Sequence, residues 1–113
     1  MQFRYLKPRA PGRCWLMKPA LLDETAAQQA LASLTGWRIE GKELVKECSF
    51  PSYLAGIDFV NRIAHVAEAM NHHPDLRVGW RKVTMTLSTH SSGGLTHLDF
   101  ELARKADALL ASM

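Results

Sequence analysis

The sequence contains no long hydrophobic run, and none of its apolar stretches approaches the roughly 18–20 residues that a membrane-spanning helix needs. This absence argues against an integral membrane protein and against a membrane as a partner. Apolar residues make up 47% of the 113 residues and charged residues 22%, as in folded globular chains. A chain of this length predicts one domain, because single domains commonly hold about 100–200 residues.

Cysteine is scarce: the chain has only Cys14 and Cys48, and they form no CxxC pair. Two cysteines so far apart provide neither a disulfide framework nor a zinc knuckle. Cys48 lies in an apolar segment, where a buried thiol is expected. This cysteine usage predicts a reducing compartment, which we take to be the cytoplasm.

Most of the chain lacks an excess of positive charge, although the net charge is +3. Residues 1–20 hold five basic residues and no acidic ones, which leaves nine basic and eleven acidic residues in the remainder. A nucleic-acid-binding groove requires basic residues concentrated on the folded surface. We therefore expect no nucleic acid among the partners.

Residues 1–20 also lack the continuous apolar stretch of a secretory signal, and their prolines oppose an amphipathic presequence helix. Met17 is an alternative start of the chain. We predict a disordered or mis-assigned basic extension over residues 1–20 and one folded domain over residues 21–113.

Several common catalytic motifs are absent from the sequence. There is no phosphate-binding glycine loop, no GxSxG nucleophile turn and no HExxH zinc motif. The Gly93-Gly94 pair lacks the strand–GxGxxG–helix context of a nucleotide site, so we interpret it as a loop.

Turn signals and hydrophobic periodicity predict seven elements in the remainder of the chain. A helix over residues 24–34 is followed by strands over 37–40 and 44–50, joined by a hairpin turn at Gly41-Lys42. A long helix then extends to about Met70, because Pro74 prevents its continuation.

Residues 76–80 and 83–87 alternate between apolar and polar side chains, which predicts two further strands with a tight turn at Arg81-Lys82. Thr96 and Asp99 resemble a capping box that opens a final helix. The order α-β-β-α-β-β-α predicts an α+β fold, with a four-stranded antiparallel sheet and helices packed on one face.

The segment that most clearly suggests a catalytic site contains two adjacent histidines, His72 and His73, where the long helix ends. Histidine there suits general acid–base chemistry, but it also commonly satisfies the last carbonyl groups of a helix. His90 follows the fourth predicted strand, and an antiparallel layout would bring it toward the helix end. The three imidazoles could alternatively supply zinc ligands. His65 and His97 are expected to be partly exposed helix residues.

These residues belong to a longer pattern that resembles the signature of the pterin-4a-carbinolamine dehydratase family. The pattern combines acidic, histidine and aromatic positions at fixed spacing: Glu68, His72-His73-Pro74, Trp80, His90 and Asp99. The surrounding Ser88-Thr89-His90 and Gly94-Leu95-Thr96, together with Gly36-Trp37, are also similar to the family. The resemblance covers about residues 21–110.

The resemblance implies a hydro-lyase that converts 4a-hydroxytetrahydrobiopterin into quinonoid dihydropterin and water during tetrahydrobiopterin recycling. It implies no metal and no organic cofactor. The three family histidines that line the pterin pocket correspond to His72, His73 and His90. We interpret His72 and His90 as proton-transfer groups and His73 as the residue that mainly binds and orients the pterin.

Four further positions match the family pattern. Glu68 is expected either to bind the pterin or orient a histidine, or else to be a solvated carboxylate. Asn71 stands where some family members have aspartate, and we include it among the substrate-binding residues. Asp99 is expected to be mainly a helix cap, and Trp80 is expected to pack in the core or on the sheet rather than stack on a ligand.

The family also includes members with a binding role, as a transcriptional coactivator or an assembly factor. A non-catalytic member of this kind is the alternative function for this chain. The resemblance further implies a homodimer or homotetramer.

Overall fold

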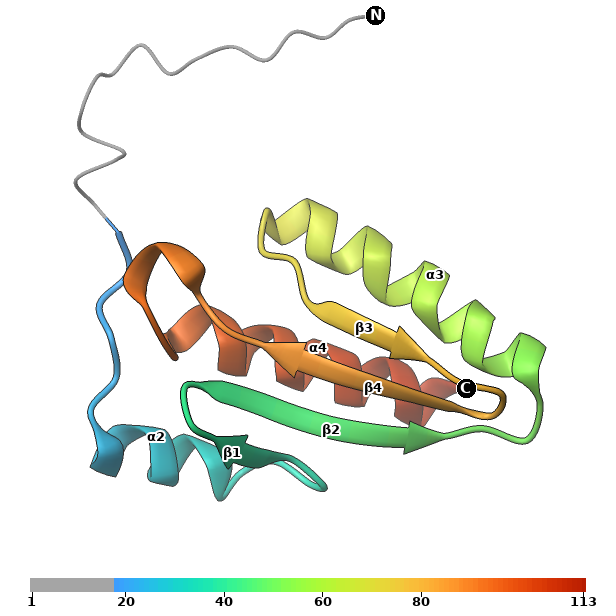
Figure 1. Ribbon diagram of the computed structural model, residues 1–113, viewed down its shortest axis with the longest axis horizontal. Helices are drawn as coiled ribbons and strands as arrows, with labels where there is room; N and C mark the ends of the chain where they lie inside the picture. Colours follow the sequence, from blue (N-terminus) through green and yellow to red (C-terminus); the bar gives the residue numbers. More distant parts are fainter. Residues whose placement is uncertain (1–17) are drawn as a thin grey trace, which may run out of the picture.

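The computed structural model describes residues 18–113 and contains three α-helices, four β-strands and one short 3₁₀ turn (Figure 1). In chain order they are α2 (Glu24–Leu31), β1 (Arg38–Glu40), β2 (Glu43–Ser49), α3 (Tyr53–Met70), β3 (Asp75–Val78), β4 (Lys82–Leu87), η1 (His90–Ser92) and α4 (His97–Ser112). The predicted order α-β-β-α-β-β-α is confirmed. Our prediction for residues 1–17 lies outside the described residues.

The four strands form one antiparallel sheet with the order β1-β2-β4-β3. The two central strands, β2 and β4, are paired from Leu44 opposite Leu87 to Ser49 opposite Lys82. The β1–β2 hairpin turns at Gly41, whose positive φ of 61° is a backbone conformation that glycine adopts without strain. The predicted hairpin at Gly41-Lys42 is therefore confirmed.

The core lies between the sheet and the helices. Figure 1 shows α4 behind the central strands, α3 near β3 and α2 beside β1. Alternate residues of the central strands point into this core, among them the fully buried Leu44, Val83, Met85 and Leu87. Phe59 and Ile63 of α3 and Leu102 of α4 complete it from the helical side. The α+β class predicted from the sequence is confirmed.

None of the helices in residues 18–113 has the length and hydropathy required to cross a membrane.

The structure corrects two predicted boundaries. The first helix ends at Leu31 and is followed by a hydrogen-bonded turn in which Leu34 N–H donates to the carbonyl of Leu31. The β3–β4 hairpin is closed by Gly79 N–H donating to the Lys82 carbonyl, 2.7 Å away. The tip of the turn is therefore Trp80-Arg81, one residue earlier than predicted.

The predicted packing of Trp80 in the core or on the sheet is wrong. This side chain is 74% exposed at the hairpin tip, where the Arg81 guanidinium lies 5.1 Å from its ring centroid. The alternating pattern through Leu76, Val78 and Trp80 suggested a longer strand, but β3 ends at Val78 because the chain turns back at Gly79.

Candidate functional site

The C-terminal end of α3 places the two adjacent histidines in different environments. Asn71 caps the helix in the left-handed conformation, with φ 53° and ψ 40°, which asparagine tolerates better than most residues. His72 N–H then donates to the carbonyl of Ala67. After this reversal the His72 side chain is 9% exposed, whereas that of His73 is 55% exposed.

His72 is bound to a fully buried carboxylate. Its Nε2 atom lies 2.6 Å from Oδ1 of Asp99, which is at the start of α4. A buried charge is costly unless it is hydrogen-bonded, so the other Asp99 oxygen also requires partners. They are the Thr89 hydroxyl at 2.8 Å and the Thr96 backbone N–H at 2.9 Å, both of which donate to Oδ2.

Two threonine hydroxyls complete this buried cluster. Thr89 Oγ1 lies 2.7 Å from Thr96 Oγ1, and both residues are buried. Thr96 is also the N-cap of α4, and Asp99 returns the bond to the Thr96 backbone, so the predicted capping box is confirmed. Asp99 therefore has two roles at once: it caps α4 and it holds His72.

His73 has a separate carboxylate partner on the surface. Its Nε2 atom lies 2.8 Å from Oε1 of Glu68, which is in the last turn of α3. Glu68 is 80% exposed, so the pair is open to solvent and accessible to a small molecule. Glu68 is therefore both solvated and in contact with a histidine.

His90 begins the 3₁₀ turn that follows β4, and it is exposed. Thr89 N–H donates to the Gly94 carbonyl at 2.9 Å, which closes the base of this loop. Beside it lies an open hollow of about 550 Å³ with mixed polar and apolar walls. It is lined by Glu40, Gly41, Lys42, Glu43, Ser88, His90 and Gly93.

The Asp99 carboxylate joins the segments that carry the three histidines. It binds His72 directly, and it binds Thr89, the residue immediately before His90. The end of α3 and the end of β4 are thereby held together, as the antiparallel layout predicted. Within residues 18–113, however, no three histidine, cysteine, aspartate or glutamate side chains form a group that could hold a metal ion.

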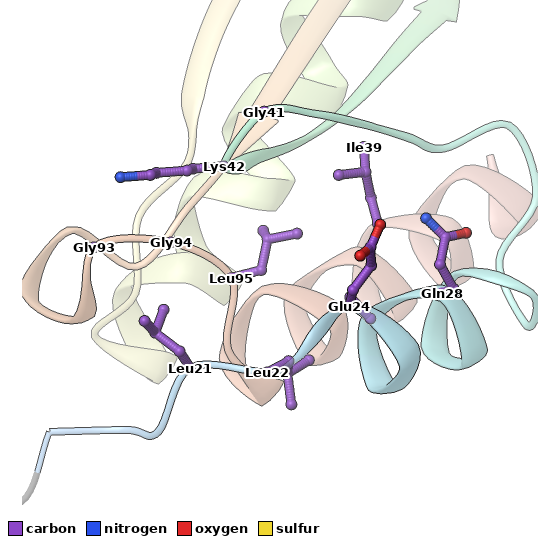
Figure 2. A pocket seen from close by; sticks show the side chains of 11 residues that line it. Leu21, Leu22, Glu24, Gln28, Ile39, Gly41, Lys42, Gly93, Gly94 and Leu95 are labelled. Carbon is purple, nitrogen blue, oxygen red and sulfur yellow. The ribbon is translucent and has the colours of Figure 1, made fainter.

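A second hollow, of about 340 Å³, shares Gly41, Lys42 and Gly93 with the first (Figure 2). Figure 2 shows Leu22 and Leu95 between Leu21 on one side and Gln28 of α2 on the other, with Lys42 extending away from them. Leu22 N–H donates to the Leu95 carbonyl and fixes this side of the hollow. It contains none of the histidines, so we do not place the candidate site there.

Thr89 and Thr96 belong to the site but are not among the residues that the sequence predicts for it. The sequence places Thr96 in a helix cap and in the family-like stretch Gly94-Leu95-Thr96, and it places Thr89 in the stretch around His90, but it gives neither residue a role in the site. The available signal was that Thr89 directly precedes a candidate histidine while Thr96 shares a capping box with Asp99. The bridge between Thr89 and Gly94, which closes the loop between β4 and α4, brings the two hydroxyls together.

Residues 20–109 match the family model described as pterin 4 alpha carbinolamine dehydratase. The chain belongs to the pterin 4 alpha carbinolamine dehydratase family. The names of two bacterial relatives assign them provisionally as pterin-4-alpha-carbinolamine dehydratases. The protein from Roseiflexus castenholzii is 46% identical over 91 residues, which cover 80% of this chain and 98% of the relative. The protein from Mycobacteroides abscessus is 49% identical over 88 residues, which cover 78% and 94%.

Solved structures from the pterin dehydratase family have the same fold. The chain aligns with a transcriptional coactivator/pterin dehydratase from Brucella melitensis with a TM-score of 0.75 and 33% identity, covering 78% of this chain and 96% of that one. It also aligns with a pterin dehydratase-like protein identified as a RuBisCO assembly factor in the alpha-carboxysome. That TM-score is 0.56 at 30% identity, with coverage of 66% and 88%. Proteins with this fold therefore include both a named dehydratase and an assembly factor.

Proposed function

We propose that the protein is a 4a-hydroxytetrahydrobiopterin dehydratase, which converts the pterin carbinolamine into quinonoid dihydropterin and water. The observation that carries the proposal is that His72, His73 and His90 are all present on two segments held together by Asp99. The family match over residues 20–109 supports a pterin as the ligand.

The reaction requires two proton transfers, and imidazoles suit both. The bond between C4a and its hydroxyl oxygen breaks as that oxygen receives a proton and leaves as water. A ring nitrogen of the pterin loses a proton, and its electron pair forms the new C=N bond. No net proton and no electron is exchanged with another reactant. General acid or base catalysis contributes about 10²–10⁴-fold for each such transfer.

We assign the proton transfers to His72 and His90, and pterin binding and orientation to His73, Glu68 and Asn71. The contact with Asp99 supports a catalytic His72, because a neighbouring carboxylate stabilises the imidazolium that forms when the ring accepts a proton. His90 is exposed beside the 550 Å³ hollow, where a bicyclic ligand can reach it. The exposed His73–Glu68 pair is suited to hydrogen-bond a pterin ring. The reaction uses neither a metal nor an organic cofactor in this proposal.

The cellular setting is part of the same proposal. We place the protein in the cytoplasm, as a homodimer or homotetramer that supports the recycling of tetrahydrobiopterin. The absence of a disulfide framework from the sequence supports a reducing compartment. In a chain of this size, self-association would add buried surface and therefore stability.

The alternative is a non-catalytic member that binds a protein partner. It is supported by the two solved structures whose names include a coactivator and an assembly factor. In that case the histidines would be dispensable and surface residues would determine function.

The deciding experiment is stopped-flow measurement of the dehydration of freshly generated 4a-hydroxytetrahydropterin. We expect the wild-type protein to accelerate the reaction, and His72→Ala and His90→Ala each to lower turnover by about 10²-fold or more. His97→Ala is the matched control, because His97 is an exposed residue at the start of α4 and has no assigned role. A folded wild-type protein that leaves the spontaneous rate unchanged would refute the dehydratase and favour the binding role.

A further inference from the structure

The buried cluster around Asp99 has a fixed direction of proton donation. The Thr96 backbone N–H and the Thr89 hydroxyl both donate to Oδ2 of Asp99. Thr89 has only one hydroxyl proton, so in the 2.7 Å contact between the two hydroxyls it must be Thr96 that donates to Thr89. Leu98 N–H in turn donates to Thr96 Oγ1. Every hydrogen bond in this series is therefore donated in the direction of the Asp99 carboxylate.

The two donors on Oδ2 leave Oδ1 as the Asp99 oxygen that contacts His72. An ionised carboxylate only accepts hydrogen bonds, so the 2.6 Å contact between Asp99 Oδ1 and His72 Nε2 requires a proton on Nε2. In the neutral imidazole the other nitrogen, Nδ1, then has the free lone pair. The hydrogen bond made by one ring nitrogen of a histidine determines whether the other nitrogen carries a proton.

We infer that Thr89 is a positioning residue for His72. Its hydroxyl, aligned by Thr96, donates to Oδ2 of Asp99 and leaves Oδ1 to accept from Nε2, which keeps His72 in the tautomer that accepts a proton at Nδ1. Thr89 does so while fixing the base of the loop that begins with His90, because its backbone N–H and C=O bond within that loop. One residue thus links the two histidines to which we assign proton transfer.

Substitutions separate this role from the alternative that Thr89 only packs. Thr89→Val has nearly the same shape but no hydroxyl, whereas Thr89→Ser keeps the hydroxyl and loses a methyl group. Thr86→Val is the matched control, because Thr86 lies three residues earlier, in β4, and is half-buried. A role limited to packing predicts that Thr89→Val is tolerated and that Thr89→Ser is not.

The inference rests on the proposed function only for its kinetic readout, and a second readout is independent of activity. Long-range ¹H–¹⁵N spectra of the histidine rings distinguish protonated from unprotonated ring nitrogens. We expect His72 of the wild-type protein, without ligand, to be protonated at Nε2. We expect Thr89→Val to weaken or redistribute that protonation, with Thr89→Ser and Thr86→Val resembling the wild type.

In the stopped-flow assay we expect Thr89→Val to lower kcat by about tenfold or more, with a smaller change in KM, because the loss concerns proton transfer rather than uniform binding. Thr89→Ser should restore most of kcat. An Nδ1-protonated His72 in the wild type would overturn the inference even where Thr89→Val does not fold. Unchanged spectra and kcat in a folded Thr89→Val variant would also overturn it.

The two proposals fail in different ways. A wild-type protein without dehydratase activity refutes the proposed function, while the ring spectra still test the link between Thr89 and His72. An active wild type whose His72 tautomer does not respond to Thr89→Val refutes only the role of Thr89.

Discussion

Asp99 Oδ1 and His72 Nε2 lie 2.6 Å apart, although the two residues are separated by 27 positions in the sequence. The contact ties the end of α3 to the first turn of α4, and both side chains are buried. The same aspartate closes the capping box of α4. Stability and the candidate site are therefore linked through one carboxylate, and substitutions near it must be tested for both.

Asp99→Ala is expected to lower the free energy of unfolding by about 2–4 kcal/mol. It removes a helix cap and leaves the buried Thr89 hydroxyl and His72 ring without their acceptor. Urea unfolding measures the change. Asp58→Ala is the control: its ion pair with Arg62 is half-exposed, and the expected loss is below about 0.5 kcal/mol. Equal losses for the two variants would contradict a special role of Asp99 in stability.

His73→Ala is expected to impair the proposed reaction without destabilising the protein. The side chain is 55% exposed and paired only with an exposed glutamate, so the free energy of unfolding should change by less than about 1 kcal/mol. Because we assign His73 mainly to pterin binding, KM should rise more than kcat falls. Glu68→Gln should have a weaker effect in the same direction. His65→Ala, on the exposed side of α3, should match the wild type; a similar defect there would argue against a specific role of His73.

Truncation of Trp37 is expected to cost much more stability than truncation of Trp80. Trp37 is 7% exposed, and its Nε1–H donates to Oδ1 of Asp107 at 3.0 Å. Trp37→Ala should cost about 3–5 kcal/mol, as for other buried aromatic residues. Trp80→Ala should cost less than about 1 kcal/mol, because the ring is 74% exposed and contacts mainly Arg81. A large loss on Trp80→Ala, measured by thermal unfolding at several protein concentrations, would place Trp80 in an interface between copies.

The buried thiol of Cys48 predicts a decrease in stability at alkaline pH. Burial raises the pKa of this thiol above its ordinary value of 9.0, although the Lys46 ammonium acts in the opposite direction. In the unfolded chain the thiol ionises first, so the folded state binds more protons above that pH. The free energy of unfolding should therefore fall as pH rises from about 9 toward the folded pKa.

This contribution can be isolated by measuring urea unfolding between pH 7 and pH 10 in a Cys14→Ser background. Cys48→Ala should show a shallower decline over the alkaline part of the range than its Cys48 counterpart. Parallel curves for the two proteins would show that the thiol does not contribute to the pH dependence.

Local patterns predicted most of the fold. Apolar alternation and turn residues located β2 and β4, the capping box located the start of α4, and Pro74 located the end of α3. The errors fell where local signals were weak. Gly79, rather than Arg81, is where the chain leaves β3, and this moved Trp80 from an expected packed position to an exposed tip.

Within the candidate site, the family pattern identified the histidines, Glu68 and Asp99, but their environments could not be read from it. His72 and His73 have the same side chain and nearly the same neighbours in the sequence. The left-handed cap at Asn71 is what turns one ring into the protein and leaves the other at the surface.

The sequence by itself determined the order of elements, the capping residues and the family to which the chain belongs, because these depend on spacing along the chain. Only the tertiary structure decided that Asp99 binds His72, that His73 binds Glu68, and that Thr89 and Thr96 form one buried hydroxyl pair. Hydrogen bonds between distant segments depend on how α4 packs against the ends of α3 and β4. Buried polar groups then pair with whatever donors and acceptors that packing brings within reach.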